Sequence, residues 1–191
     1  DFAAARNESL KYATGDWILV LDADEVIAKR DLNLLLDKIM GCEENVVAFS
    51  LIQRNYTNSS SDPFWVSALD DPYNESKCAD GWISNSIIRL FKNNISLKFS
   101  GSVHESIRYS VLNGKIVKLD LPIHHFGHLK LDAASSEKKH QFYTQLGLKK
   151  IEEKDDYISY FEVGKEYLYE NNLTEAEIYF QKSILRNNYF Y

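Results

Sequence analysis

The feature of this sequence that most constrains its fold is a short apolar run that ends in acidic residues. Trp17-Ile-Leu-Val-Leu21 has the length and the β-favouring composition of a strand buried on both faces, as strands of parallel sheets are. The run continues directly into Asp22-Ala-Asp-Glu25. Because open α/β sheets bind ligands outside the carboxyl ends of their strands, Asp22 and Asp24 are predicted to lie at a binding site.

The residues around this strand predict alternating helices and strands. Alanine-rich residues 2–13 favour a helix that Gly15 ends. Residues 32–39 carry apolar side chains at helical spacing, and Asp31 precedes them as an expected N-cap. Residues 46–52 predict another strand. Helix, strand, helix and strand in close succession are typical of an α/β fold.

A long polar segment, residues 55–84, interrupts this pattern and carries Trp65, Tyr73 and Trp82. Loops of this length in compact domains tend to be lids or binding loops. We expect Trp82 to contact the core, whereas Trp65 and Tyr73 either stack on a ligand or hold the loop in place. Further short strands are predicted at residues 86–91, 96–99, 115–119 and 121–125.

The character of the sequence changes near Leu131, after which it is helical. Helices are expected at about 133–154, 158–170 and 174–186. We therefore predict two parts, an α/β domain over residues 1–130 and an all-α tail over residues 131–191.

Composition limits the classes of function that fit this chain of 191 residues. The 22 Lys and Arg residues are outnumbered by 28 Asp and Glu residues, giving a net charge of −6, which argues against nucleic acid as a partner. No apolar run approaches the ~20 residues of a membrane helix, so neither a transmembrane segment nor a signal peptide is expected. Cys42 and Cys78 are too few for a disulfide scaffold and are interpreted as free thiols of a reducing compartment.

Asp22 and Asp24 have the spacing of a metal-binding carboxylate pair. Two carboxylates on one extended tip repel each other, and a divalent cation relieves that repulsion. A hard ion such as Mg²⁺ or Mn²⁺ held in this way also binds phosphate oxygens. The alternative is that the aspartates only cap the turn that follows the strand.

Three motifs in order over residues 1–128 resemble family 2 glycosyltransferases of the GT-A fold. The segment DFAAARNESLKYATGDWILVLDADE resembles the family's "AARN" helix and the "GDWIL.LDADE" strand after it. The segment IIRLFKNNISLKFSGSVHESI resembles the later "RLFRN…F.G.vHE" stretch, and LPIHHFGH resembles the "I.HYG" close. The resemblance implies a partial GT-A sheet with helices on both faces.

The resemblance also implies a role for several residues. Asp24 would be the metal ligand of the DxD pair, with Asp22 nearer the ribose of the nucleotide. Arg6 and Asn7 match the family's "RN" and would support the nucleotide-binding side. His125 stands where GT-A enzymes place a late histidine that contacts metal or diphosphate. The implied cofactor is Mn²⁺ or Mg²⁺, and the implied donor is a nucleotide-diphosphate sugar.

Glu105 is the expected general base of this chemistry. In an inverting transfer, a carboxylate takes the proton of the acceptor hydroxyl while metal neutralises the leaving diphosphate on the opposite face of the sugar. The neighbouring His104 either orients Glu105 or binds substrate or metal itself. Alternatively, Glu105 only caps a helix.

The tail resembles a single tetratricopeptide repeat. The matching residues are Tyr160, Val163, Gly164, Tyr167, Ala176, Phe180 and Ser183. Two antiparallel helices need the small residues Gly164 and Ala176 where they cross. Because such repeats stack, the pair is expected to pack on the helix at 133–154 or to continue beyond Tyr191. Its expected role is to bind a protein partner, and the alternative is that it covers the catalytic domain.

Two other functions are compatible with parts of the sequence. Asp22-x-Asp24-x-Val26 after an apolar strand also resembles the haloacid-dehalogenase phosphatases, in which the first aspartate is the nucleophile. That interpretation leaves the AARN, His-Glu and HHFG segments unexplained. A non-catalytic partner-binding module is the other alternative, because the chain opens at Asp1 inside a predicted helix.

The GT-A resemblance begins part-way into the fold, so we expect an N-terminally truncated piece of the enzyme with an exposed sheet edge. The acceptor is expected to be a glycan or a protein. We expect the protein in the cytoplasm, either free or peripheral at the inner membrane face.

Overall fold

The computed structural model describes residues 2–94, 96–101, 105–111, 114–127, 129 and 133–187. Of residues 108, 109 and 133–137 it describes the backbone alone. The chain divides into two compact units. One comprises Asp1–Ser9, Phe99–Ser106 and Leu131–Tyr191, and the other comprises Leu10–Lys98 and Ile107–Lys130. The boundary at residues 130 and 131 stays a prediction, because both residues lie outside the described part.

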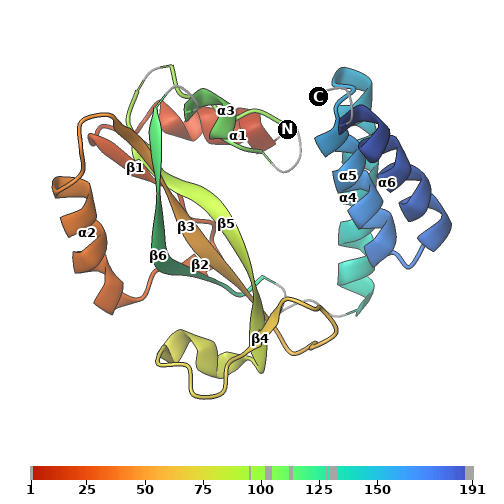
Figure 1. Ribbon diagram of the computed structural model, residues 1–191, viewed down its shortest axis with the longest axis horizontal. Coiled ribbons are helices and arrows are strands. Elements are labelled where there is room, and N and C mark those ends of the chain that lie inside the picture. Colours follow the sequence, from red (N-terminus) through yellow and green to blue (C-terminus); the bar gives the residue numbers. More distant parts are fainter. Residues whose placement is uncertain are drawn as a thin grey trace. The chain divides into compact units, whose positions relative to one another are not determined.

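A mixed β-sheet forms the centre of the second unit (Figure 1). Its described strands follow the order β1 (Trp17–Leu19), β5 (Gly81–Lys92), β3 (Val46–Thr57), β6 (Lys115–His125) and β2 (Glu25–Val26), with β4 (Trp65–Ser67) paired to β5. β3 and β6 run parallel, and the other described pairs are antiparallel. The long strands β5 and β6 therefore pair with the short strands β1 and β2, and the acidic residues lie between β1 and β2 in the sequence.

The core of this unit lies between the central strands and helix α2 (Leu32–Met40), which runs alongside the sheet in Figure 1. Leu35 is the buried contact of α2, and Leu51 and Ile123 are fully buried on β3 and β6. Asp31 does not cap α2 with its side chain, because the short helix η1 (Lys29–Asp31) leads directly into it. The apolar periodicity predicted this helix correctly, whereas the capping prediction was wrong.

The apolar run of residues 17–21 is less buried than its composition predicted. β1 lies at the end of the described strand order and pairs antiparallel with β5, and Leu19 and Leu21 are more than a third exposed. A strand with a neighbour on one side is shielded less than a central parallel strand, which is why burial on both faces was the wrong expectation. What pairs with the outer edge of β1 stays a prediction.

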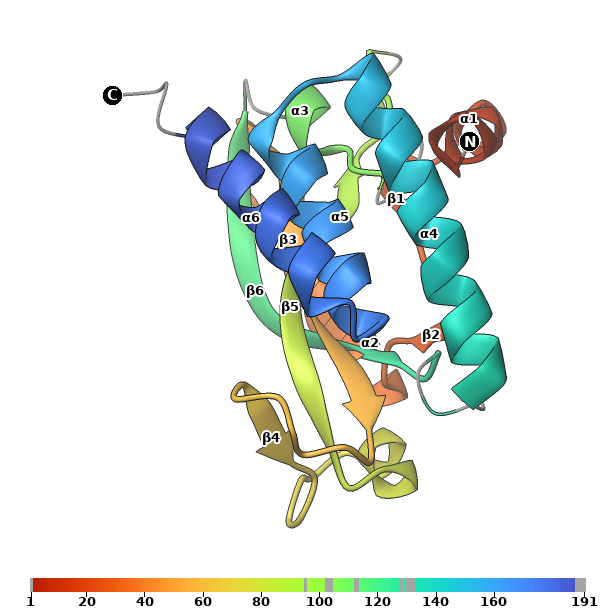
Figure 2. The same cartoon turned by 90° about the vertical axis from the view of Figure 1, so that its right-hand side faces the viewer.

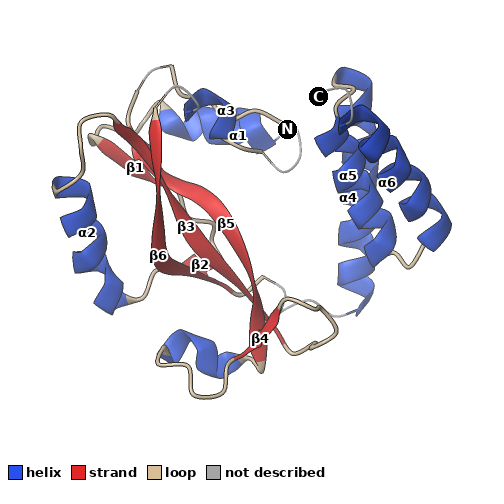
Figure 3. Ribbon diagram, in the orientation of Figure 1, coloured by secondary structure: helices blue, strands red, loops and turns tan. Residues whose placement is uncertain are grey.

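Residues 55–84 contain more regular structure than the predicted loop. β3 continues to Thr57 and β5 starts at Gly81, while β4 and helix η2 (Asn74–Cys78) lie between them (Figure 3). Burial of Tyr56 against Trp82 accounts for the longer strands, since their rings meet edge-on with centroids 6.1 Å apart. Likewise, β6 is one continuous strand where two were expected, and residues 96–99 are not a strand.

Alternating cations and aromatic rings hold the segment around Tyr73 against the sheet. The Arg30 guanidinium lies 3.5 Å from the centre of the Tyr73 ring, and Arg54 lies 4.9 Å from Tyr73 and 4.3 Å from Trp82. Arg54 also pairs with Asp71 at 2.8 Å. Burial alone would raise the pKa of Asp71, but bonds from the Tyr73 N–H and Arg54 outweigh it and lower that pKa. Tyr73 is thus a structural anchor, and Trp82 is buried as predicted.

The first unit contains helix α1 (Phe2–Leu10), most of which belongs to it, and the tail helices α4 (Ala133–Glu153), α5 (Tyr157–Tyr169) and α6 (Leu173–Asn187). α5 lies between α4 and α6 (Figure 2). The Asp156 carboxylate caps α5 by accepting a bond of 2.8 Å from the Ser159 N–H. A short helix, α3 (Arg108–Val111), belongs to the other unit. An α/β sheet followed by a helical tail confirms the predicted fold class.

Small residues lie where the tail helices cross, as the repeat-like spacing predicted. A Cβ on Gly164 would stand 2.7 Å from the Phe180 ring, and one on Gly147 would stand 2.7 Å from Val163 Cγ2. Ala176 of α6 is buried. These contacts require glycine at both positions, because a methyl group at either one would overlap a packed neighbour.

The long helix α4 packs against α5. Three polar pairs join these helices: Lys150 Nζ to Glu162 Oε2 at 2.6 Å, His140 Nδ1 to Glu166 Oε2 at 2.8 Å, and Thr144 Oγ1 to Glu170 Oε1 at 2.6 Å. Packing on the long helix, as expected, is therefore observed, and continuation beyond Tyr191 stays a prediction. Among the described residues, none of the helices combines the length and apolar character of a membrane span.

Replacing Gly164 by valine is expected to destabilise the tail by about 1–3 kcal/mol, because its side chain would overpack the Phe180 ring. Urea unfolding followed by circular dichroism measures the change. Lys165→Val is the matched control, since Lys165 is the next residue of α5 and is exposed. Equal stability of the two variants would contradict the crossing described above.

Candidate functional site

The acidic residues after β1 form a tight turn that leads into β2. The Glu25 N–H donates to the Asp22 carbonyl at 2.9 Å, and the Asp22 N–H donates to Glu25 Oε2 at 2.9 Å. These two bonds close the turn on itself. The side chains of Asp22 and Asp24 are each 37% exposed, so both carboxylates are accessible to a ligand.

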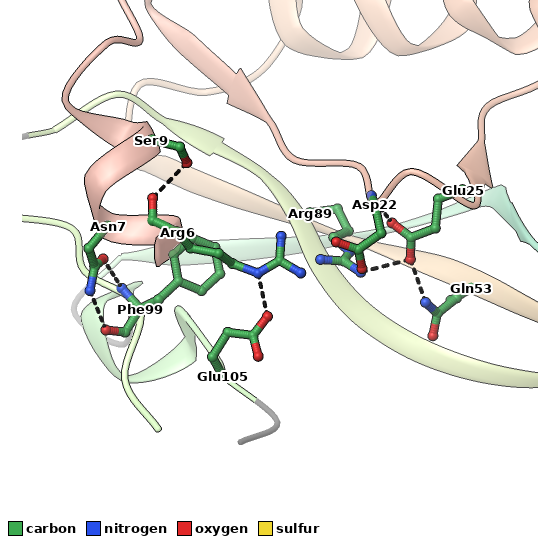
Figure 4. A network of polar contacts seen from close by, with 9 residues as sticks. All are labelled: Arg6, Asn7, Ser9, Asp22, Glu25, Gln53, Arg89, Phe99 and Glu105. Atoms are coloured by element: carbon green, nitrogen blue, oxygen red, sulfur yellow. Dashed lines mark hydrogen bonds and ion pairs between the residues drawn. The ribbon is translucent and has the colours of Figure 1, made fainter. Parts of the chain in front are cut away.

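Arg89 of β5 holds this turn from the interior of the sheet (Figure 4). Its Nη2 lies 2.6 Å from Asp22 Oδ2 and 2.7 Å from Glu25 Oε1. The Glu25 side chain is 0% exposed and also accepts a bond of 2.5 Å from Gln53 Nε2. A buried carboxylate is tolerated only when it is paired and hydrogen-bonded, so Arg89 and Gln53 make the position of Glu25 possible. Asp22 is consequently fixed by an ion pair on one of its oxygens.

Asp24 lies beside His125 because of the pairing of β2 with β6. Glu25 is opposite His125 in this ladder, and the Phe126 N–H donates to the Asp24 carbonyl at 3.0 Å. His125 Nε2 is 3.4 Å from Asp24 Oδ2. Gly127 permits the approach, since a Cβ there would stand 2.5 Å from Asp24 Oδ2 and 2.7 Å from His125 Nε2. The structure thus brings together the two residues that the sequence assigned to metal.

His124 and His125 have different environments. His124 is fully buried, and its Nδ1 lies 2.6 Å from the Tyr56 hydroxyl. Burial lowers the pKa of His124 and raises the pKa of Tyr56 to about 12, so both side chains are uncharged at neutral pH. His125 lies at the site, and its Nδ1 is 2.7 Å from Asn55 Oδ1. The buried histidine is therefore held by a tyrosine hydroxyl.

Asp24 and His125 have the donor atoms and the separation that suit one divalent ion. A carboxylate oxygen and an imidazole nitrogen about 3.4 Å apart can both bind an ion at about 2.1 Å. Within the described ranges, no group of three or more His, Cys, Asp or Glu side chains is placed to hold a metal. Mg²⁺ sites commonly use one or two carboxylates with the remaining positions left to water and phosphate, and an imidazole nitrogen suits a transition metal ion. The residues therefore fit an ion that binds together with a phosphate ligand.

The other expected site residues belong to the first compact unit. The Asn7 side chain forms two bonds with the backbone of Phe99, accepting from its N–H at 2.8 Å and donating to its carbonyl at 2.9 Å (Figure 4). Arg6 forms an ion pair with Glu105 and lies 5.6 Å from the centre of the Phe99 ring. Both residues of the "RN" pair therefore hold the segment that carries Glu105. His104 lies outside the described residues.

Sequence reasoning did not single out Arg89, Glu25, Gln53 or Asn55. Arg89 stands in the quoted IIRLFKNN segment and Glu25 in LDADE, so both were within a recognised pattern. Their partners come from strands far apart in the sequence, and that pairing is a property of the sheet. A charged residue in the middle of an apolar strand, as Arg89 is, was the signal that could have identified it.

Comparison with known protein families gives a match that covers the N-terminal part of the chain. A family model described as glycosyl transferase family 2 matches residues 1–102, more than half of the chain. The matched segment includes α1, the acidic turn, Arg89 and Asn55.

Comparison with individual proteins gives similarity to glycosyltransferases and to a repeat protein. A TPR repeat-containing protein of Synechococcus elongatus is 31% identical over 139 residues, covering 67% of this chain and 28% of that protein. The SPbeta prophage-derived glycosyltransferase SunS of Bacillus subtilis and glycosyltransferase SunS of Bacillus phage SPbeta are each 27% identical over 192 residues, covering 99% of this chain and 40% of theirs. The chain thus spans less than half the length of these relatives.

Arg89→Met is expected to destabilise the protein by about 3–5 kcal/mol, because it leaves the buried Glu25 carboxylate without its cation. Chemical unfolding measures the loss. Adding Glu25→Gln to the same variant is expected to restore most of it, since no buried charge then remains unpaired. If the free energy of unfolding of Arg89→Met lies within about 1 kcal/mol of the wild-type value, the ion pair behaves like an exposed one.

Proposed function

Because the chain belongs to glycosyl transferase family 2, we propose that it acts in the transfer of a sugar from a nucleotide-diphosphate donor to an acceptor hydroxyl. The observation that carries this proposal is the acidic turn after β1. Asp22 and Asp24 are accessible there within the matched residues, and Asp24 lies beside His125. The relatives named as glycosyltransferases cover nearly the whole of this chain, which supports the same role.

In this proposal, Asp24 and His125 hold Mn²⁺ or Mg²⁺. The ion supplies positive charge that neutralises the leaving diphosphate. Asp22 faces the ribose of the nucleotide, where a carboxylate accepts bonds from sugar hydroxyls. Its ion pair with Arg89 leaves Asp22 a poorer metal ligand than Asp24, because the guanidinium already neutralises one carboxylate oxygen.

Glu105 is the proposed general base of an inverting transfer. A carboxylate in this role accepts the proton of the acceptor hydroxyl as the oxygen attacks the anomeric carbon. The Arg6 ion pair orients the Glu105 carboxylate, and the Asn7 bonds to Phe99 fix the backbone a few residues before it. His104 is proposed to contact substrate next to Glu105. Arg6 and Asn7 are therefore proposed to position Glu105, in addition to the support of the nucleotide-binding side that the resemblance implied.

The acceptor is proposed to be a glycan or a protein. The helical tail is a second candidate for function, because α5 and α6 cross as a repeat pair and one relative is named as a TPR repeat-containing protein. A partner protein bound by the tail is the role proposed for it. The phosphatase alternative is not supported, since the matched family is a different one.

Asp24→Asn is expected to weaken Mn²⁺ binding about tenfold or more, because the site loses one of its two protein ligands. Calorimetry with Mn²⁺ in the presence of UDP measures the affinity. Asp120→Asn is the matched control, as Asp120 is an exposed aspartate of β6. If Asp24→Asn binds Mn²⁺ as tightly as Asp120→Asn does, the ion is held elsewhere.

Glu105→Gln is expected to lower turnover by about 10²–10⁴-fold while donor binding stays unchanged, because the amide cannot accept the proton. Release of UDP from a panel of UDP-sugars, measured with Mn²⁺ and an acceptor, tests both the transfer and the base. Glu44→Gln, at an exposed position, is the control. If Glu105→Gln turns over as fast as the wild type, the base is another carboxylate. If the wild type cleaves no donor, the proposed function is contradicted.

A further inference from the structure

Asn55 lies between two neighbouring strands and contacts one residue on each. In the register of the sheet, it stands opposite Ile83 of β5 and beside His125 of β6. The residue is only 8% exposed, so its amide has little access to solvent. Its hydrogen bonds are therefore made to the two strands that flank it.

These bonds determine which way the Asn55 amide is turned. Its Nδ2 lies 3.1 Å from the Ile83 carbonyl oxygen, which can only accept a hydrogen bond. The amide NH₂ must therefore face Ile83, and the carbonyl oxygen Oδ1 must face His125. Reversing the amide would place two acceptor oxygens against each other at Ile83.

The orientation of Asn55 in turn determines the tautomer of His125. Asn55 Oδ1 is an acceptor and lies 2.7 Å from His125 Nδ1, so Nδ1 must carry a hydrogen. A neutral imidazole has one N–H, and Nε2 is then an electron-pair donor. That nitrogen lies 3.4 Å from Asp24 Oδ2. An imidazole nitrogen and a carboxylate oxygen, both electron-rich, consequently face one small region.

The surroundings favour a cation in that region. Gly127 leaves no side chain there, since a Cβ would overlap both Asp24 Oδ2 and His125 Nε2. The backbone bond between Phe126 and Asp24 and the ladder between Glu25 and His125 hold the two residues in register. Hydrogen bonds to the second nitrogen of a histidine commonly orient the ring for metal binding.

We propose that Asn55 is a positioning residue that fixes His125 in its Nδ1–H tautomer, so that Nε2 and the Asp24 carboxylate bind one divalent cation together. Asn55 does not touch the ion itself and acts through the imidazole ring. This inference rests on the proposed function, because it assigns a residue to the metal site of that reaction. The other arrangement is a doubly protonated His125 that forms an ion pair with Asp24 and needs no metal.

The first experiment measures the tautomer directly in the metal-free protein. Long-range ¹H–¹⁵N correlation spectra of the imidazole groups, recorded well above the ordinary His pKa of about 6.5, distinguish Nδ1–H, Nε2–H and doubly protonated rings. The His125 signals are assigned by their loss in His125→Gln. The expected result is Nδ1–H in the wild type. Asn55→Leu removes the acceptor, so Nε2–H is expected to appear.

The second experiment titrates Mn²⁺, alone and with UDP, and follows the free ion by electron paramagnetic resonance. Asn55→Leu is expected to bind Mn²⁺ about 10-fold more weakly than the wild type. Asn85→Leu is the matched control, because Asn85 is an exposed asparagine of β5. Circular dichroism verifies that each variant is folded.

Two results overturn the inference. One is a wild-type His125 in the Nε2–H or doubly protonated form, and the other is unchanged Mn²⁺ affinity in folded Asn55→Leu. If Asn55→Leu fails to fold, the tautomer of His125 in the wild type still decides the question. Absence of Mn²⁺ binding by a wild-type protein with the Nδ1–H tautomer would contradict the metal dependence of the proposed function, while the role of Asn55 in setting the tautomer would stand.

Discussion

The buried guanidinium of Arg89 is the interaction on which the acidic turn depends. Asp22 and Glu25 stand close together, and one of these carboxylates is removed from solvent, so without a cation their repulsion and desolvation would open the turn. Arg89 supplies that cation from β5, and Gln53 supplies a further bond from β3. The long strands β3 and β5 therefore fix the conformation of the acidic turn that follows the short strand β1.

The remaining part of the site follows from pairing between strands. β2 and β6 place Asp24 beside His125, and β3 places Asn55 against the far side of the same imidazole. Each of these residues is held by backbone ladders that also form the core, so the site is carried by rigid elements. In the other unit, Arg6 forms an ion pair with Glu105, and Asn7 forms two hydrogen bonds with the backbone of Phe99.

Close packing of the tail helices depends on two glycines. Gly164 lets the Phe180 ring approach the backbone of α5, and Gly147 does the same for Val163 between α4 and α5. Polar pairs then join α4 to α5. A relative named for its TPR repeats is in keeping with this architecture.

The sequence by itself determined α1, α2, the three tail helices, most of the strands and the family, because these are encoded in local periodicity and in contiguous motifs. It identified Asp22, Asp24, Arg6 and Glu105 as residues of interest, yet it could not say that Arg89 binds Asp22 or that Arg6 binds Glu105. It overestimated the burial of residues 17–21 and missed Asn55. Those features were decided by the tertiary structure alone, because strand order and register bring together side chains that lie far apart along the chain.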